Sequence, residues 1–210
     1  MENLNQLNIL NKHRVINVDN KLEISKPSIL LHSCCGPCST AVMERLVSRF
    51  QVTIYFYNPN ITDEEEYIRR RDSQILAVKE FNKESSQGKV GYKEGPYDPE
   101  NFYLMAKGLE EEKEGGNRCT KCFNLRLIKT AEIANIEKYD FFGTTLTVSP
   151  HKNYLQIGQI GNVIGAKYGV TFLNEDFKKK AGFQRSIELS KKFKLYRQNY
   201  CGCQYSVWDK

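Results

Sequence analysis

The chain has 210 residues, which is enough for one domain with some elaboration but too few for two large domains. Hydrophobic residues make up 40% of it and charged residues 27%, a balance typical of a globular protein, and no apolar run is long enough to span a membrane. The polar N-terminus lacks the apolar core and cleavage site of a signal peptide, so we expect a cytoplasmic protein.

Hydrophobic periodicity predicts alternating strands and helices along most of the chain. Predicted strands cover 28–33, 51–59, 89–93, 139–148 and 170–173. Predicted helices cover 39–50, 62–82, the first part of 97–119, 122–139 and 154–169, and Thr62 with Glu65 has the register of a capping box. This alternation predicts an α/β fold with a mainly parallel sheet and helices on both faces. We expect a polar extension over 1–26 and a single α/β domain over 27–210.

The carboxyl edge of such a sheet is where the functional crevice is expected. A cysteine-rich loop, LLHSCCGPCST, follows the strand that ends at residue 33, and the loop SPHKN follows the strand that ends at residue 148. Both loops therefore lie at the same edge, and residues far apart in the sequence can meet there.

The seven cysteines fall into three groups beside polar residues: Cys34, Cys35 and Cys38, then Cys119 and Cys122, then Cys201 and Cys203. In a reducing compartment this grouping favours metal binding or redox chemistry over structural disulfides. CGPC at 35–38 matches the redox motif of thioredoxins, but the usual preceding aromatic residue is replaced by Cys34 and four further cysteines have no use in thiol exchange. A metal centre is therefore the better interpretation.

Four thiols would satisfy either a zinc ion or an iron–sulfur cubane, and three would remain. Adjacent residues in a regular strand or helix point their side chains apart, so Cys34 and Cys35 are poorly placed to bind one ion. We expect them to serve two neighbouring metal centres.

The positive charge is concentrated near the C-terminus. Residues 178–197 carry eight Lys or Arg against one Glu, and the rest of the chain has a net charge of −1. With the interleaved aromatic residues, the basic segment 178–200 suits a phosphate backbone and stacked bases, although a solvated helix face would show the same lysine pattern.

Four motifs in this order, LLHSCCGPC, NRCTKCFNLRL, TTLTVSPHKN and YRQNYCGCQYS, resemble the cobalamin-independent epoxyqueuosine reductases of the QueH type over residues 27–206. The resemblance implies a Rossmann-like fold similar to the adenine-nucleotide α-hydrolases, without their phosphate-binding loop, whose place is taken by HSCCGPC. It also implies a 4Fe-4S cluster with an adjacent mononuclear metal, most simply iron, held by the seven cysteines. Some members carry an acidic residue where this chain has Cys38, which suggests that Cys38 binds the second metal.

The resemblance further implies reductive removal of the epoxide oxygen from epoxyqueuosine at the wobble position of tRNA, with electrons from a donor such as flavodoxin or ferredoxin. His151 and Cys38 are the catalytic candidates, His151 as a proton donor or phosphate ligand. Candidate tRNA contacts are Arg118, Lys152, Asn153, Arg197 and Tyr200, and Arg126 joins Arg118 beside the second cysteine pair.

Two other functions fit parts of this pattern. Zinc held by four cysteines would stabilise an RNA-binding module without catalysis. A tRNA sulfur-transfer enzyme would share the fold and the cysteines but would hydrolyse ATP.

Overall fold

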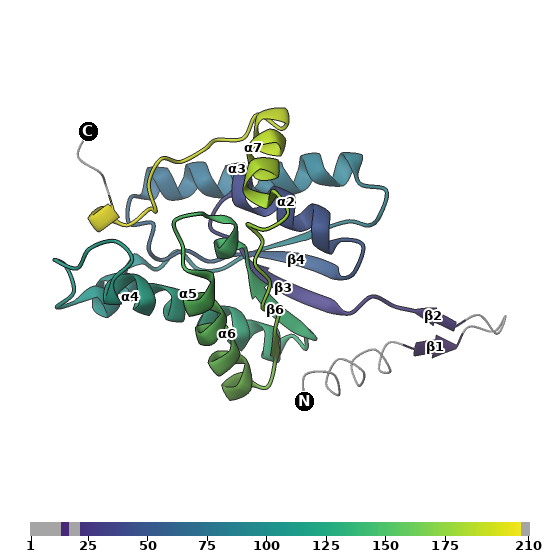
Figure 1. Cartoon of the computed structure of the whole chain (residues 1–210), viewed down its shortest axis with the longest axis horizontal. Helices are drawn as coiled ribbons and strands as arrows, with labels where there is room; N and C mark the ends of the chain where they lie inside the picture. The colour runs from purple at the N-terminus through teal and green to yellow at the C-terminus, as the bar shows by residue number, and fades with distance from the viewer. Residues whose placement is uncertain (1–13, 17–21, 207–210) are drawn as a thin grey trace.

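The computed structural model describes residues 14–16 and 22–206, and its centre is a five-stranded parallel sheet (Figure 1). The strands are β3 (Ser28–His32), β4 (Gln51–Phe56), β5 (Gly91–Glu94), β6 (Phe141–Thr144) and β7 (Thr171–Phe172). Their order in the sheet is β5-β4-β3-β6-β7, so the chain builds outward from β3 on one side and then crosses to the other. This confirms the predicted Rossmann-like α/β fold and places its switch point between β3 and β6.

Helices cover both faces of the sheet. They are α2 (Gly36–Leu46), α3 (Glu64–Glu84), α4 (Pro99–Ala106), α5 (Asn117–Ile136), α6 (Tyr154–Tyr168) and α7 (Gly182–Lys192), with 3₁₀ turns η1 (Thr145–Val148) and η2 (Gln204–Ser206). Helix α2 packs against α3 and α7 on one face, and α5 packs against α6 on the other (Figure 1). The basic segment therefore contains a helix, α7, docked on α2.

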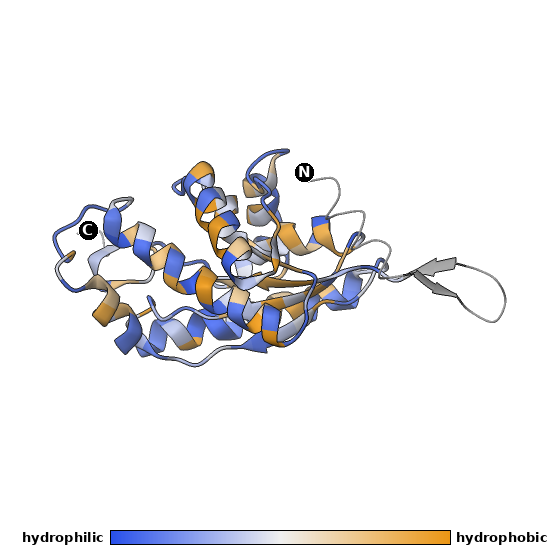
Figure 2. Cartoon of the chain, turned by 90° about the horizontal axis from the view of Figure 1, so that it is seen from below, coloured by the Kyte–Doolittle hydropathy of each residue, from blue (hydrophilic) through white to orange (hydrophobic). Residues whose placement is uncertain are grey.

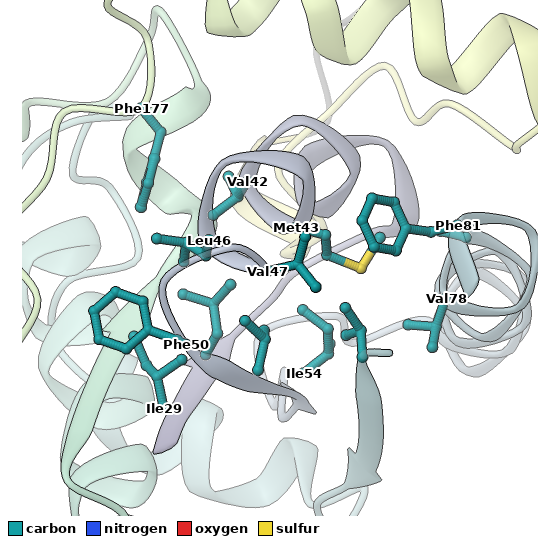
Figure 3. Close-up of a cluster of buried hydrophobic side chains, with 14 of the residues drawn as sticks. Ile29, Val42, Met43, Leu46, Val47, Phe50, Ile54, Val78, Phe81 and Phe177 are labelled. Atoms are coloured by element: carbon teal, nitrogen blue, oxygen red, sulfur yellow. The ribbon is translucent and has the colours of Figure 1, made fainter. Parts of the chain in front are cut away.

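The central strand β3 shows why both faces are covered. Ile29 and Leu31 point into a core formed with α2, α3 and α7 (Figure 3), whereas Leu30 points into a second core with α5 and α6. Successive strand residues alternate between faces, so a strand with consecutive apolar residues must be buried on both. Figure 2 shows the result, with hydrophobic strands inside and hydrophilic loops at the periphery.

Several predicted boundaries were wrong. The strand predicted over 139–148 ends at Thr144, whose hydroxyl accepts from the Leu146 amide and caps the turn η1. The long helix is capped by Asp63, which accepts from the Glu66 amide, instead of by Thr62. Helix α2 begins at Gly36, and α5 begins five residues before its predicted start. As a result, Cys38 and Cys119 lie on the first turns of helices instead of in loops.

Within the predicted extension 1–26, β1 (Arg14–Ile16) pairs antiparallel with β2 (Leu22–Ile24), and residues 1–13 and 17–21 lie outside the described residues. Across 14–16 and 22–206, every helix is too short or too polar to cross a membrane.

Gly36 lets α2 begin in contact with α3. A Cβ atom built on Gly36 would lie 2.4 Å from the Ser73 carbonyl oxygen, a backbone atom that cannot move alone. We expect Gly36→Ala to lower the free energy of unfolding by about 1–3 kcal/mol, as overpacking does, in a chemical denaturation experiment. The control is Gly143→Ala, whose Cβ would have the end of the Leu31 side chain as its nearest neighbour, at 3.3 Å, and no backbone atom among its three nearest. Equal stability of the two variants would contradict this close approach.

Candidate metal centre

Three thiols meet where β3 ends and α2 begins. The sulfur atoms of Cys34, Cys35 and Cys38, the first thiol group, all lie within 4.8 Å of one another. Cys34 Sγ and Cys35 Sγ are 3.9 Å apart, so the adjacent thiols do not point apart as regular geometry predicted. The reason is the change of backbone at Cys35, which is extended while the next residue starts the helix. This group is compact enough to bind one metal ion.

Hydrogen bonds and burial give the cysteines of the first thiol group different pKa values. Bonds from Cys35 and Cys38 stabilise the thiolate of Cys34 and hold its pKa well below the usual range. Burial raises the pKa of Cys35 to about 12. Cys35 Sγ also accepts a hydrogen bond of 3.0 Å from Gln198 Nε2, which comes from a segment 163 residues later. A donor aimed at this sulfur would equally stabilise a metal-bound thiolate.

The other four cysteines surround a separate small cavity. Cys119 and Cys122 come from the first turns of α5, and Cys201 and Cys203 come from the segment after α7; together they form the second thiol group. Burial raises the pKa of Cys122 to about 12 and also raises the pKa of Cys203. The Cys119 sulfur accepts a hydrogen bond of 3.2 Å from the Gly115 amide. The two pairs, distant in the sequence, thus converge on one cavity.

Two cations lie between the thiol groups. Arg126 is 1% exposed, donates from Nε to the Cys122 carbonyl at 3.2 Å, and lines both the cysteine cavity and the larger groove beside it. Lys152 Nζ lies 3.4 Å from Cys201 Sγ. Burial alone would lower the pKa of Lys152, but the thiolates of Cys201 and Cys34 outweigh burial and raise it, so this lysine stays protonated. Both cations favour anionic sulfur in their surroundings.

The segment 194–203, here called the C-terminal strap, is anchored on α3. Arg70 forms a buried ion pair with Glu66 at 2.6 Å and donates to the carbonyls of Cys201 and Tyr200 at 3.0 and 3.2 Å. The Tyr196 hydroxyl donates to the other oxygen of Glu66 at 2.7 Å. The position of Cys201 therefore depends on the buried ion pair between Arg70 and Glu66.

His32 lies at the end of β3 and is fully buried. Its Nε2 faces the Tyr57 carbonyl at 3.2 Å and its Nδ1 faces the Thr144 hydroxyl at 2.9 Å. Because a carbonyl can only accept, Nε2 carries the proton and Nδ1 accepts from Thr144. Burial, helped by the charge of Arg126, lowers the pKa of His32 to about 3, so it is neutral and serves to fix the sheet edge.

A groove of about 560 Å³ opens beside the first thiol group, a volume typical of small-molecule sites. The walls come from the turn η1 and the loop after it, from α7 and from the strap. The sequence-predicted residues in its lining are Cys34, Cys38, His151, Lys152, Arg197, Tyr200 and Cys201. His151 is exposed and lines both this groove and the cysteine cavity.

Two of the residues predicted to contact tRNA, Asn153 and Arg118, make hydrogen bonds within the protein. Asn153 caps α6 by accepting from the Gln156 amide at 3.3 Å, and it is absent from the linings of the groove and the cavity. Arg118 is 1% exposed and donates from Nη1 to the carbonyls of Leu109 and Glu110, each at 2.9 Å. This geometry favours a role for Arg118 in shaping the loop before α5 over contact with a phosphate.

Unsatisfied buried atoms indicate that the cysteine cavity is built for a polar occupant. Among the described residues the buried side-chain atoms without a partner are Asn58 Oδ1, Asn60 Oδ1, Asp98 Oδ1, Arg118 Nε and Arg126 Nη2. Asn60, Arg118 and Arg126 all line this cavity. An orphaned buried group costs about 1–3 kcal/mol, and such groups are few in native structures. Thiols with cationic donors around one cavity fit an anionic iron–sulfur group.

Sequence reasoning missed Glu66, Arg70, Gln198 and Asn60. Arg70 lies in a run of three arginines on an otherwise polar helix, RRRD, which gives no hint that only the middle one is buried. Gln198 stands in YRQNYC, and its position before Cys201 was the one available signal.

Comparisons with known proteins agree with this geometry. A sequence model of the family described as epoxyqueuosine reductase QueH matches residues 29–209. A protein named epoxyqueuosine reductase QueH from Staphylococcus epidermidis is 45% identical over 184 residues, covering 87% of this chain and 77% of its own. The proteins of the same name from Streptococcus pyogenes and Thermotoga maritima are 41% and 34% identical, covering 99% and 87% of this chain and 82% and 92% of their own. By its matched length and its identity to these relatives, the chain belongs to the epoxyqueuosine reductase QueH family.

Proposed function

We propose that this protein reduces epoxyqueuosine in tRNA to queuosine, the reaction for which its family and relatives are named. The observation that carries the proposal is the convergence of all seven cysteines, in two groups, beside a groove of nucleoside size at the sheet's switch point. The reaction breaks both carbon–oxygen bonds of the epoxide, consumes two electrons and two protons, and releases water as the ring gains a double bond.

Each of the two thiol groups would form one metal site. The second thiol group, with four cysteines around one cavity, would hold a 4Fe-4S cluster, and the first thiol group, with three sulfurs within 4.8 Å, would hold a mononuclear iron. When bound, these groups supply one-electron transfer and a Lewis acid for the epoxide oxygen. Cys34 and Cys38 both belong to the first thiol group and line the groove, and we expect Cys38, the catalytic candidate, to lie beside the reacting ring.

The side chains around the groove would bind the substrate and manage its protons. His151 is exposed at the junction of groove and cavity, where a proton donor to the leaving oxygen is needed. Protonated Lys152 holds Cys201 and adds positive charge beside the reacting oxygen. Arg197 and Tyr200 line the groove from the strap, where they suit a phosphate and a stacked base.

The basic segment would bind the anticodon arm of the tRNA. Part of its charge is already paired, because Arg185 contacts Glu44 and Glu188 and Lys192 contacts Glu84. Lys179, Lys180 and Lys194 are exposed and have no side-chain ion pair among the described residues. We expect a cytoplasmic enzyme that takes electrons from a small carrier such as flavodoxin or ferredoxin.

Turnover can be tested directly with protein purified without oxygen. Incubation with epoxyqueuosine-containing tRNA and a chemical reductant should give queuosine, identified by mass spectrometry of the digested nucleosides as the loss of one oxygen atom. The purified protein should contain inorganic sulfide and a visible absorbance band that bleaches on reduction. A colourless zinc protein that binds tRNA without turnover would instead support a non-catalytic RNA-binding module.

A further inference from the structure

Glu114 occupies the place where the groove and the cysteine cavity meet. The residues that line both are Glu114, Gly115, Arg126, His151, Lys152 and Cys201. Glu114 is the only carboxylate among the described residues lining either space. The charged side chains beside it are Arg126 and Lys152, with Cys201 Sγ 3.4 Å from Lys152 Nζ.

The loop that carries Glu114, residues 107–116, is held firmly although it is on the surface. Arg118 donates to three of its carbonyls, and the Glu112 carboxylate accepts from the Asn117 amide at 3.1 Å. Next to Glu114, the Gly115 amide donates to Cys119 Sγ, with φ of 91° at Gly115 that favours glycine. The carboxylate of Glu114 itself is exposed and makes no hydrogen bond or ion pair with any described residue. Its backbone is thus fixed to the metal centre while its side chain remains available.

The substrate of the proposed function carries a positive charge where this carboxylate lies. In epoxyqueuosine a secondary amine joins the base to the five-membered ring, at the ring carbon next to the epoxide. Such an alkylamine is protonated near neutral pH. Once the epoxide lies between the thiol groups, the ammonium must lie close by, among Arg126 and Lys152, which would repel it. A carboxylate at the junction removes this conflict.

We propose that Glu114 binds the ammonium of the substrate and thereby distinguishes tRNA carrying the modified base from tRNA carrying guanine. The inference rests on the proposed function, and it makes Glu114 a specificity-determining residue that also orients the epoxide. A carboxylate in a groove for tRNA weakens binding of the phosphate backbone, so its presence is useful only if a substrate cation compensates.

Binding measurements with two tRNAs of the same sequence test this role without depending on turnover. One tRNA carries queuosine, which keeps the amine but has no epoxide, and the other carries guanine. The proteins are the anaerobically purified wild type, Glu114→Gln, Glu114→Asp and the matched control Glu111→Gln. Glu111 lies in the same loop, is exposed and lines neither space. Iron and sulfide contents should be equal in all four.

We expect the wild type to prefer the queuosine tRNA. Glu114→Gln should lose about tenfold in affinity for it, the size of a lost hydrogen bond to a charged group, and should bind guanine tRNA as well as or better than the wild type. Glu114→Asp should retain more of the preference than Glu114→Gln. Glu111→Gln should change both affinities by the same small factor.

A Glu114→Gln variant with the wild-type preference would overturn the role of Glu114, and wild-type turnover of epoxyqueuosine would then still support the proposed function. A wild-type protein that neither distinguishes the two tRNAs nor turns over epoxyqueuosine would overturn both.

Discussion

Replacing Arg70 with methionine should lower the free energy of unfolding by about 3–5 kcal/mol, the range for breaking a buried ion pair by removing one partner. Arg70 and Glu66 have side chains that are 1% and 6% exposed, so the substitution leaves a carboxylate buried without its counter-charge. It also removes the two hydrogen bonds that Arg70 donates to the carbonyls of Tyr200 and Cys201 in the strap. Stability and metal content should therefore fall together.

Arg69→Met is the matched control, because it makes the same chemical change one residue earlier on α3. Arg69 pairs with Glu65 in the same i,i+4 spacing, but these side chains are 55% and 83% exposed. An exposed pair contributes only about 0–1 kcal/mol, so this variant should unfold almost like the wild type. Chemical denaturation of both proteins without oxygen measures the difference. Similar losses in the two variants would show that burial of Arg70 does not determine its contribution.

Replacing Cys122 with serine should eliminate the bound inorganic sulfide and all turnover, whereas Cys38→Ser should keep the sulfide and lose roughly one iron per chain together with turnover. The difference follows from the proposed division, since Cys122 lines the cavity of four thiols and Cys38 belongs to the compact group of three. Serine is close to cysteine in size, so both variants should fold.

Iron and sulfide analysis of the two anaerobic variants, alongside the wild type, measures this division. Circular dichroism provides the check on folding. Loss of sulfide from Cys38→Ser would show that the first thiol group also ligates the cluster, and full sulfide in Cys122→Ser would remove this cysteine from the cluster.

Much of the fold could be predicted because local sequence patterns determine where its strands and helices lie. Residues 29–31 and 54–56 are consecutive apolar or aromatic residues, a pattern typical of a strand buried on both faces. The carboxyl-edge placement of the cysteine loop and of SPHKN then follows from topology. The boundary errors have a local cause that periodicity does not show, since Pro37 allows α2 to begin before its apolar repeat and the Thr144 hydroxyl ends β6 early.

The arrangement of the centre could not be predicted, because its contacts join residues that are distant in the sequence. The sequence gives no reason for Gln198 to face Cys35, or for Arg70 rather than Arg69 to hold the strap, until α3 and the strap are packed together. The prediction that the side chains of Cys34 and Cys35 point apart was wrong for another reason. Rules for regular strands and helices do not apply at the junction where a strand ends and a helix begins.

The strap has a consequence for how the enzyme is made. Cys201 and Cys203 follow every strand of the main sheet and α7 along the chain. When the ribosome has translated all of these elements, two of the four cysteines of the second thiol group have still not been synthesised. Under the proposed assignment, iron and sulfide can be fully ligated only after this segment has left the exit tunnel. Cofactor insertion is then a late, post-translational event that acts on an almost finished protein, and a message truncated before Cys201 would encode every strand of the sheet but an incomplete redox centre.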